Sequence, residues 1–300
     1  MKRALGAGDD LHAGEEPPIL LCCDLDCTLI PNGSQPESAQ ARARLRALCA
    51  RPEVHLVFVS GRDLRLVLDG ITEWALPVPE FIIGDVGTTI YAPRDGNDWQ
   101  HWDAWTAEIA PDWNGLCHAD LAALFADITA LEKQEVAKQG AFKLSYYVDL
   151  ALNREVLLAE LQSRLWSQGV NASLIWSVDE AAGTGLLDIL PAQASKLHAM
   201  EFLIGSQGYD MQHAIFCGDS GNDLMALVSP IQGVLVRNAQ QEVKDEAMRL
   251  VSAAGMERML YIAQGDFLGM NGNYAAGVLE GVAHYLPETL PWMQLEAERD

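Results

Sequence analysis

Three short runs of apolar residues in this sequence are each followed at once by polar or acidic side chains. The runs span residues 19–23, 54–59 and 214–217, and the first two lead directly into Asp24 and Ser60. Continuous apolar runs of this length are typical of parallel strands that are covered on both faces. Because the carboxyl ends of parallel strands line one edge of an open sheet, these polar groups are expected to share a ligand-binding crevice. The pattern therefore predicts an α/β fold with its site at that edge.

Helix patterns separate the apolar runs. Ala41, Leu45 and Leu48 are spaced i, i+4, i+7, as on the buried face of a helix, and the apolar run 81–83 has 88–91 as a hairpin partner. This alternation of strand, helix and strand predicts a doubly wound, Rossmann-like parallel sheet. The same alternation of strands and helices is predicted again later in the chain, with an apolar run at 186–190, a helix from Lys196, and strands at 214–217 and 233–236.

The middle of the chain differs in composition. Residues 93–114 contain Gly96, Asn97, Pro111 and four tryptophans. The pattern predicts that helices at 119–138 and 153–168 and strands at 142–148 and 172–178 follow. We therefore predict an α+β cap domain inserted into the core. The predicted divisions are an N-terminal extension at 1–18, a core of 19–92 and 185–300, and a cap of 93–184.

Charge and cysteine content exclude several classes of protein. The sequence has 42 Asp and Glu against 20 Lys and Arg, a net charge of −22, which repels nucleic acid and anionic membrane surfaces. Its six cysteines form no CxxC pair, which favours a reduced, cytoplasmic setting. No secretory signal is recognised, and no apolar run approaches the ~20 residues that span a bilayer. We therefore expect a soluble cytoplasmic protein that binds neither nucleic acid nor membranes.

Four aspartates are predicted to meet at the sheet edge. Asp24 and Asp26 are two residues apart, so their side chains would face the same side of an extended chain. Asp219 and Asp223 follow the run at 214–217. So many like charges need a compensating cation, and oxygen ligands of this kind favour Mg²⁺ held together with a substrate phosphate. A metal facing a carboxylate nucleophile indicates phosphoryl transfer through an aspartyl-phosphate, with a second Asp as acid and base.

A hydroxyl and an ammonium group are also needed to hold the phosphoryl oxygens. Ser60 and Lys196 are the available groups, and Lys196 begins a predicted helix whose free N–H groups would add donors. Each has an ordinary structural alternative, since Ser60 could be a helix N-cap and Lys196 a solvated side chain. Residues 218–223 could likewise form a simple turn. The order of these groups along the chain, after buried-type strands, favours the catalytic interpretation.

In that order the residues resemble the motifs of the haloacid dehalogenase (HAD) superfamily of phosphatases. The resemblance implies that Asp24 is the nucleophile and Asp26 the general acid and base. It also implies that Asp24, the main-chain carbonyl of Asp26 and Asp219 ligate Mg²⁺, with Asp223 close by. Two residues, Cys27, between the acids and Thr28, and Ser60, where members of the closer family named below often carry Thr, are modest departures that remove no needed functional group. The matching residues, motif by motif, are Asp24, Asp26 and Thr28; Ser60; Lys196; and Asp219 with Asp223.

Segments 84–88, 143–149, 233–240 and 274–285 are similar to the sucrose-phosphate phosphatase family within that superfamily. The family implies hydrolysis of sucrose 6-phosphate to sucrose and phosphate, a step of sucrose biosynthesis, which makes the upstream synthase a candidate partner. Relatives in the same group act on mannosylfructose phosphate or on glycosyl-glycerate phosphates. The phosphate and substrate contacts that the resemblance implies are Thr28, Ser60, Gly61, Lys196, Asn222 and Lys143.

Two alternatives from other classes stay open. A sugar phosphomutase with the same core would return the phosphoryl group to a sugar instead of water. A degenerate regulatory domain would only bind sugar phosphates, and the intact acids, Ser60 and Lys196 argue against it. The sequence thus favours a Mg²⁺-dependent phosphatase of a phosphorylated sugar.

The predicted cap would choose the leaving group, because it would close over the site and exclude water. Trp99, Trp102 and Trp105 lie at i, i+3, i+6, so on a helix they would share a face, and we expect them to pack into the cap's own core. Lys143 and Tyr147 lie in the family-like strand, which makes them the candidates for contact with the sugar.

Overall fold

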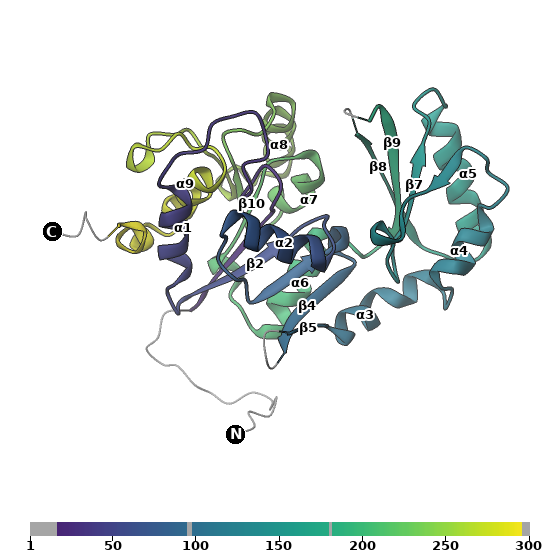
Figure 1. Cartoon of the computed structure of the whole chain (residues 1–300), viewed down its shortest axis with the longest axis horizontal. Coiled ribbons are helices and arrows are strands. Elements are labelled where there is room, and N and C mark those ends of the chain that lie inside the picture. Colours follow the sequence, from purple (N-terminus) through teal and green to yellow (C-terminus); the bar gives the residue numbers. More distant parts are fainter. Residues whose placement is uncertain (1–16, 95–97, 180–181, 296–300) are drawn as a thin grey trace, which may run out of the picture.

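The computed structural model describes residues 17–94, 98–179 and 182–295, and its strands form two separate sheets (Figure 1). The larger sheet has eight strands in the order β12-β11-β10-β1-β2-β3-β4-β5, and the smaller has four in the order β6-β7-β9-β8. The strand bounds are β1 Ile19–Cys23, β2 Val54–Val59, β3 Phe81–Gly84, β4 Thr89–Arg94, β5 Asp98–His101, β6 Leu131–Lys133, β7 Leu144–Val148, β8 Ala172–Asp179, β9 Thr184–Pro191, β10 Ala214–Gly218, β11 Gln232–Leu235 and β12 Leu260–Ile262.

The helices are short. In the described ranges none is long and apolar enough to cross a bilayer, which takes ~20 residues. The helix bounds are α1 Ala41–Cys49, α2 Leu64–Trp74, α3 Asp103–Ile109, α4 His118–Leu124, α5 Arg154–Ser167, α6 Lys196–Gln207, α7 Leu224–Leu227, α8 Gln241–Ala254 and α9 Ala275–Tyr285.

Helices cover both faces of the larger sheet. In the central strand β1, Ile19, Leu21 and Cys23 pack with α1, α2 and α9, whereas Leu20 and Cys22 pack with α3, α6, α7 and α8. Because successive side chains of a strand point to opposite faces, a strand covered on both sides needs apolar residues at every position. The strands from β12 to β3 are parallel, and β4 and β5 are antiparallel additions at one edge. The predicted doubly wound α/β fold is confirmed.

In the described residues, the α-helices that pack on the smaller sheet, α4 and α5, lie on one face of it. Leu121 of α4 and Leu161 of α5 pack against Tyr146 of β7 and Leu187 of β9 in a separate apolar cluster. In Figure 1 these helices lie on the side turned away from the larger sheet, so the open face of the smaller sheet is turned toward it. We call this sheet, with α4 and α5, the cap.

Two strands lie in a different sheet from the one expected. The apolar run within β9 was expected to return to the core, but β9 pairs with β7 and β8 in the cap, so that prediction is wrong. Conversely, β5 falls inside the predicted cap range, yet it extends the larger sheet next to β4. The sequence of an apolar run does not show which strands will pair with it. The composition change near Ala92 coincides with the hairpin of β4 and β5 at the edge of the larger sheet, not with the start of the cap.

The tryptophan-rich stretch and the helix expected at 119–138 also differ from prediction. Trp99 lies on β5 and the buried Trp105 on α3, where it packs against Phe202 of α6 in the core, not in the cap. The expected long helix ends at Leu124, and the chain then forms β6, which pairs with β7. Residues 131–133 form a strand instead of a helix because they pair with β7, a tertiary contact that the local sequence pattern does not show.

Two glycines of α9, Gly277 and Gly281, have a spacing that predicts close helix packing, and α9 does lie directly on β11. A Cβ atom built on Gly281 would lie 2.4 Å from the Cγ atoms of Val234. We expect Gly281→Ala to lower the free energy of unfolding by about 1 to 3 kcal/mol, because the extra methyl group overpacks the core. Gly205→Ala is the matched control, because its Cβ would meet open space on α6, and it should raise stability by about 0.5 kcal/mol. Urea unfolding of both variants measures this, and equal effects would contradict the packing role.

Candidate active site

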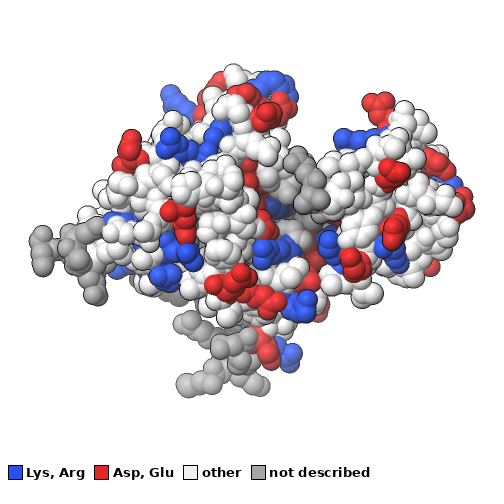
Figure 2. Space-filling view, turned by 45° about the horizontal axis from the view of Figure 1, so that its top comes forward, with Lys and Arg blue, Asp and Glu red and all other residues white. Residues whose placement is uncertain are grey.

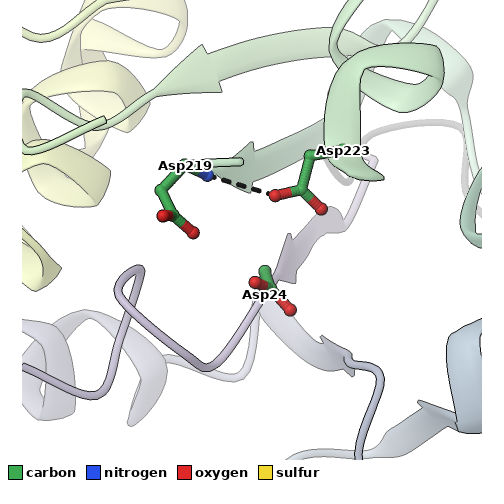
Figure 3. A group of neighbouring side chains, drawn as sticks. All are labelled: Asp24, Asp219 and Asp223. Atoms are coloured by element: carbon green, nitrogen blue, oxygen red, sulfur yellow. Dashed lines mark hydrogen bonds between the residues drawn. The ribbon is translucent and has the colours of Figure 1, made fainter. Parts of the chain in front are cut away.

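Three aspartates lie together where two neighbouring strands end (Figure 3). Asp24 follows β1, and Asp219 and Asp223 follow β10, which pairs with β1 in parallel register. The Asp24 N–H donates to the Cys217 carbonyl at 2.9 Å, so this pairing extends to the first aspartate. One oxygen of each carboxylate lies within 4.8 Å of the others. The sheet edge thus brings together residues that are about two hundred positions apart in the chain.

Lys196 supplies a positive charge to this group. Its ammonium donates to Asp24 Oδ1 at 3.0 Å, to Asp223 Oδ1 at 2.7 Å and to Asn222 Oδ1 at 3.2 Å. Lys196 is the first residue of α6, where Ser195 is the N-cap and accepts from the His198 N–H. The side chain is buried, so the ammonium is held between the carboxylates with little screening by water.

The three carboxylates differ in how many protein donors they have. Asp223 has the most donors, because its Oδ1 accepts from Lys196 and its Oδ2 accepts from the N–H groups of Asp219 and Ser220 at 3.2 and 3.1 Å. Within the described part of the chain, Asp219 accepts a side-chain hydrogen bond only from the Thr28 hydroxyl, at 3.1 Å. The second oxygen of Asp24 accepts no hydrogen bond from the described residues. Free acceptor oxygens therefore remain on Asp24 and Asp219.

The pKa values of these two carboxyls are raised, chiefly by burial. Burial raises the pKa of Asp24 despite the opposing attraction of Lys196, and Asp223 and Asp219 raise it further. Burial, with Asp223 as the next cause, raises the pKa of Asp219 to about 7. Three carboxylates and one ammonium leave room for a divalent cation, and an all-oxygen donor set fits Mg²⁺. The residues that could hold such an ion are Asp24, Asp219 and Asp223.

Asp26 does not join this group. The carboxylate forms a bidentate pair with Arg62, with Nε–Oδ2 and Nη2–Oδ1 distances of 2.9 and 2.6 Å, and accepts from Asn32 at 2.7 Å. The expectation that Asp24 and Asp26 face one side as in a strand is wrong, because β1 ends at Cys23 and the chain turns, with Cys27 at a φ of 55°. Asp26 instead presents a partly exposed carboxylate to the neighbouring cavity.

A cavity of about 410 Å³ adjoins the aspartates, in the hollow that separates the larger sheet from the cap (Figure 2). Acidic and basic side chains both border this hollow in the space-filling view. Three further residues implied by the resemblance, Thr28, Ser60 and Lys196, are buried and do not line the cavity. Those that line it are Asp24, Asp26, Gly61, Lys143, Asp219 and Asn222.

The cavity wall also contains residues that had no assigned role from sequence. Arg62 orients Asp26, Asp85 follows β3, and Lys138 comes from the cap. Asp85 could have been found by the rule that identified Asp24, because it directly follows an apolar run of the same sheet. Lys138 lies in a segment expected to be helical, so its approach to the core had no local signal.

Tyr147, a candidate for contact with the sugar, lies outside this cavity. Its hydroxyl bonds to both carboxylate oxygens of Glu135, at 3.0 and 2.9 Å, and its ring lies 5.6 Å from the Lys138 ammonium. The residue lines a different hollow of the cap, together with Glu132 and Asp149. Lys143, which directly precedes β7, lines the cavity at the aspartates.

The C-terminal segments singled out in the sequence support the first motif from behind. Asn238 donates to the Cys27 carbonyl at 2.6 Å and accepts from the Tyr274 N–H at 2.8 Å. Tyr274 is fully buried, and its hydroxyl donates to the Gln35 carbonyl at 3.1 Å. These hydrogen bonds join the loop containing Asp26 and Thr28 to the start of α9.

Comparison with known proteins gives concordant results. The family model described as sucrose-6F-phosphate phosphohydrolase matches residues 17–286. A putative HAD-like hydrolase of Nitrosococcus oceani is 54% identical over 93% of this chain and 75% of its own length. The mannosylfructose-phosphate phosphatase of Agrobacterium fabrum is 30% identical over 90% of this chain and 98% of its own. A sucrose-phosphatase of Synechocystis, solved with sucrose and phosphate, superposes with a TM-score of 0.69 and 25% identity, over 90% of this chain and 98% of that one.

Proposed function

The chain belongs to the sucrose-6F-phosphate phosphohydrolase family of HAD-type phosphatases, and on that premise we propose that it hydrolyses a disaccharide phosphate, with sucrose 6-phosphate as the first candidate. It is a phosphatase of phosphorylated sugars by family. The observation that carries the proposal is that Asp24 and Asp219 line a cavity whose wall also includes cap residues, while the buried Lys196 contacts Asp24 from behind. The synthase partner and the cytoplasmic location expected from sequence stay predictions.

In the proposed reaction, a carboxylate oxygen of Asp24 attacks phosphorus, and the bond from phosphorus to the sugar oxygen breaks. Asp26 gives its proton to the departing alkoxide, which leaves as a sugar hydroxyl. Asp26 then takes a proton from water as the water oxygen attacks phosphorus, which releases phosphate and restores Asp24. The bidentate contact with Arg62 holds Asp26 at the cavity wall and favours its carboxylate form, which is the form that takes the proton from water.

Lys196 and Ser60 act on the phosphoryl group in this scheme. Lys196 already contacts Asp24 Oδ1, so its ammonium lies beside the attacking carboxylate and can balance the phosphoryl oxygens. Ser60 directly follows β2 and is fully buried, with its Oγ accepting from the Arg62 N–H at 3.2 Å. When bound by Asp24, Asp219 and Asp223, with the Asp26 carbonyl as the resemblance implies, Mg²⁺ would reduce the repulsion between carboxylate and phosphate.

The test is a phosphate-release screen of the purified protein with Mg²⁺. The substrates are sucrose 6-phosphate, mannosylfructose phosphate, a glycosyl-glycerate phosphate and small hexose phosphates, with a hexose bisphosphate added to detect phosphomutase activity. We expect a disaccharide phosphate to be turned over fastest, and the relative from Agrobacterium fabrum makes mannosylfructose phosphate the second candidate. Turnover of small hexose phosphates alone would overturn the proposed substrate class.

Magnesium is expected to stabilise the protein more at pH 8 than at pH 5. Because the pKa of Asp219 rises from 3.8 to about 7, the folded metal-free protein keeps a proton there that the unfolded chain loses above about pH 4. The contribution of Asp219 to the free energy of unfolding therefore falls as the pH rises from about 4 to about 7. A cation bound to the ionised carboxylate offsets that loss. At about 100 times its Kd at pH 8, Mg²⁺ should add about 2.7 kcal/mol to the free energy of unfolding.

Urea unfolding with Mg²⁺ or EDTA at both pH values measures this difference. The same Mg²⁺ concentration should add much less at pH 5, where protons compete for the carboxylates. Asp219→Asn is the control, because it removes the titrating group and should abolish most of the stabilisation. Equal stabilisation of the unaltered protein at the two pH values would contradict the assigned site.

A further inference from the structure

Asp85 occupies an unusual turn at the end of β3. Asp85, Val86 and Gly87 have φ values of 52°, 63° and 96°, so three consecutive residues are left-handed and two of them are not glycine. A left-handed residue with a Cβ atom costs about 1 to 2 kcal/mol, and a β-branched valine is especially unfavourable there. Such a turn persists only where its surroundings determine it, and it is typical of functional sites.

The surroundings of this turn are well defined. The Asp85 and Val86 N–H groups donate to the carbonyls of Arg62 and Ser60, at 3.0 and 3.2 Å. The Trp105 indole donates to the Gly87 carbonyl at 3.1 Å. A Cβ atom on Gly87 would lie 2.4 Å from the Ser195 main chain, so the turn is packed against the start of α6. The main chain of Asp85 is therefore held in a fixed place relative to the start of α6.

Asp85 is buried, borders two cavities, and its carboxylate has few donors from the protein. It lines the cavity at the aspartates and also a neighbouring hollow of about 330 Å³, whose other wall includes Gln139 and Phe142 of the cap. Its hydrogen-bond donors are Thr89 and the Tyr91 hydroxyl, the latter at a long 3.5 Å, although the residue is only 6% exposed. Among the described residues no lysine, arginine or histidine lies within 4.0 Å of it. Burial raises its pKa, and Lys143 across the cavity lowers it.

The other carboxylates of the cavity wall already have a role in the fold or in the candidate site. Asp63 caps α2 by accepting from the Leu66 N–H at 2.7 Å. Asp26 is paired with Arg62, and Asp24 and Asp219 belong to the cation group. Asp85 is the carboxylate of this wall, within the described residues, that has no strong partner.

We propose that Asp85 is a specificity-determining residue, whose carboxylate accepts hydrogen bonds from hydroxyl groups of the sugar that leaves. This rests on the proposed function. The phosphoryl group must lie against Asp24, and Asp85, Lys138 and Lys143 line the same cavity, so they are the residues available to contact the leaving group. A carboxylate only accepts, and vicinal hydroxyls are paired donors, so a polyhydroxylated leaving group satisfies a buried acceptor that the protein leaves weakly bonded.

The test uses Asp85→Asn and Asp85→Gly. Both residues tolerate a left-handed backbone, so the turn is retained while the carboxylate is lost. With whichever of sucrose 6-phosphate and mannosylfructose phosphate the unaltered protein hydrolyses faster, KM should rise about tenfold to a hundredfold, as expected for a lost hydrogen bond to a charged group. The Ki of inorganic phosphate, which lacks the sugar, should stay within about twofold of its original value by the same reasoning.

Asp69→Asn is the matched control, because Asp69 is exposed on α2 and lines neither cavity. It should change neither KM nor Ki. An unchanged KM in both Asp85 variants, or a parallel rise in the phosphate Ki, would overturn the specificity role, the latter by showing a general disturbance of the site. If the unaltered protein hydrolyses neither sugar phosphate, the proposed function fails and the role of Asp85 falls with it.

Discussion

Asp24→Asn is expected to lower the rate of phosphate release by about ten-thousandfold or more, because the attacking carboxylate oxygen is replaced by an amide that does not form an acyl phosphate. The fold should be unaffected or slightly more stable. Burial raises the pKa of Asp24, which means that its ionised form disfavours the metal-free folded state near neutral pH. A neutral side chain of the same shape removes that cost, and Asp223 still balances Lys196.

Phosphate release and urea unfolding of the same preparation, at pH 8 and without metal in the unfolding arm, separate these two effects. Activity should collapse while the free energy of unfolding is maintained, a combination typical of a residue selected for chemistry over stability. Asp69→Asn again serves as the control, since it makes the same chemical change at an exposed position. Turnover above about one hundredth of the original rate would contradict a nucleophilic role, given the size of such losses in other enzymes.

Lys196→Met should damage both activity and stability. The change leaves the buried carboxylates of Asp24 and Asp223 without the ammonium that now lies 3.0 and 2.7 Å from them. Removing one partner of a buried ion pair costs about 3 to 5 kcal/mol, and losing one electrostatic contact to the reacting group costs about a hundredfold to a thousandfold in rate. Without Lys196 the pKa of Asp24 should rise further, so the loss of stability should be larger at pH 8 than at pH 5.

A second substitution distinguishes the structural role of Lys196 from its catalytic one. In Lys196→Met with Asp223→Asn, one of the two unbalanced charges is gone, so part of the stability should return while turnover does not. Lys133→Met is the control for loss of a lysine, because Lys133 is exposed on β6. Full stability in Lys196→Met alone would show that the buried carboxylates do not depend on the ammonium.

The net charge of −22 now has a partly functional explanation. Asp24, Asp219 and Asp223 concentrate negative charge at one point, where Lys196 and a cation can convert it into a site for phosphate. Lys138 and Lys143 add positive charge on the cap side of the same cavity. An acidic protein can therefore bind an anionic substrate, because the local arrangement of charges decides the sign of the field within the site.

The sequence alone predicted the core strands and the sheet edge at which the candidate site residues lie. The strands β1 and β2 have the bounds expected from their apolar runs, because a strand buried on both faces requires an unbroken apolar stretch. The residues after β1, β2 and β10 had to meet for an equally local reason, since parallel strands end at one edge. Spacing along the chain was sufficient for both conclusions.

Only the tertiary structure decided which sheet β5 and β9 join, where Asp26 points and what Asp85 faces. Strand pairing depends on distant partners, so the apolar run of β9 could not disclose that β7 and β8 lie beside it. Side-chain direction beyond a strand depends on turn dihedrals, such as φ of 55° at Cys27, and on contacts such as the one from Arg62 to Asp26. The cavity lies between the core and the cap, and its lining residues come from widely separated parts of the sequence. Local sequence patterns therefore could not predict it.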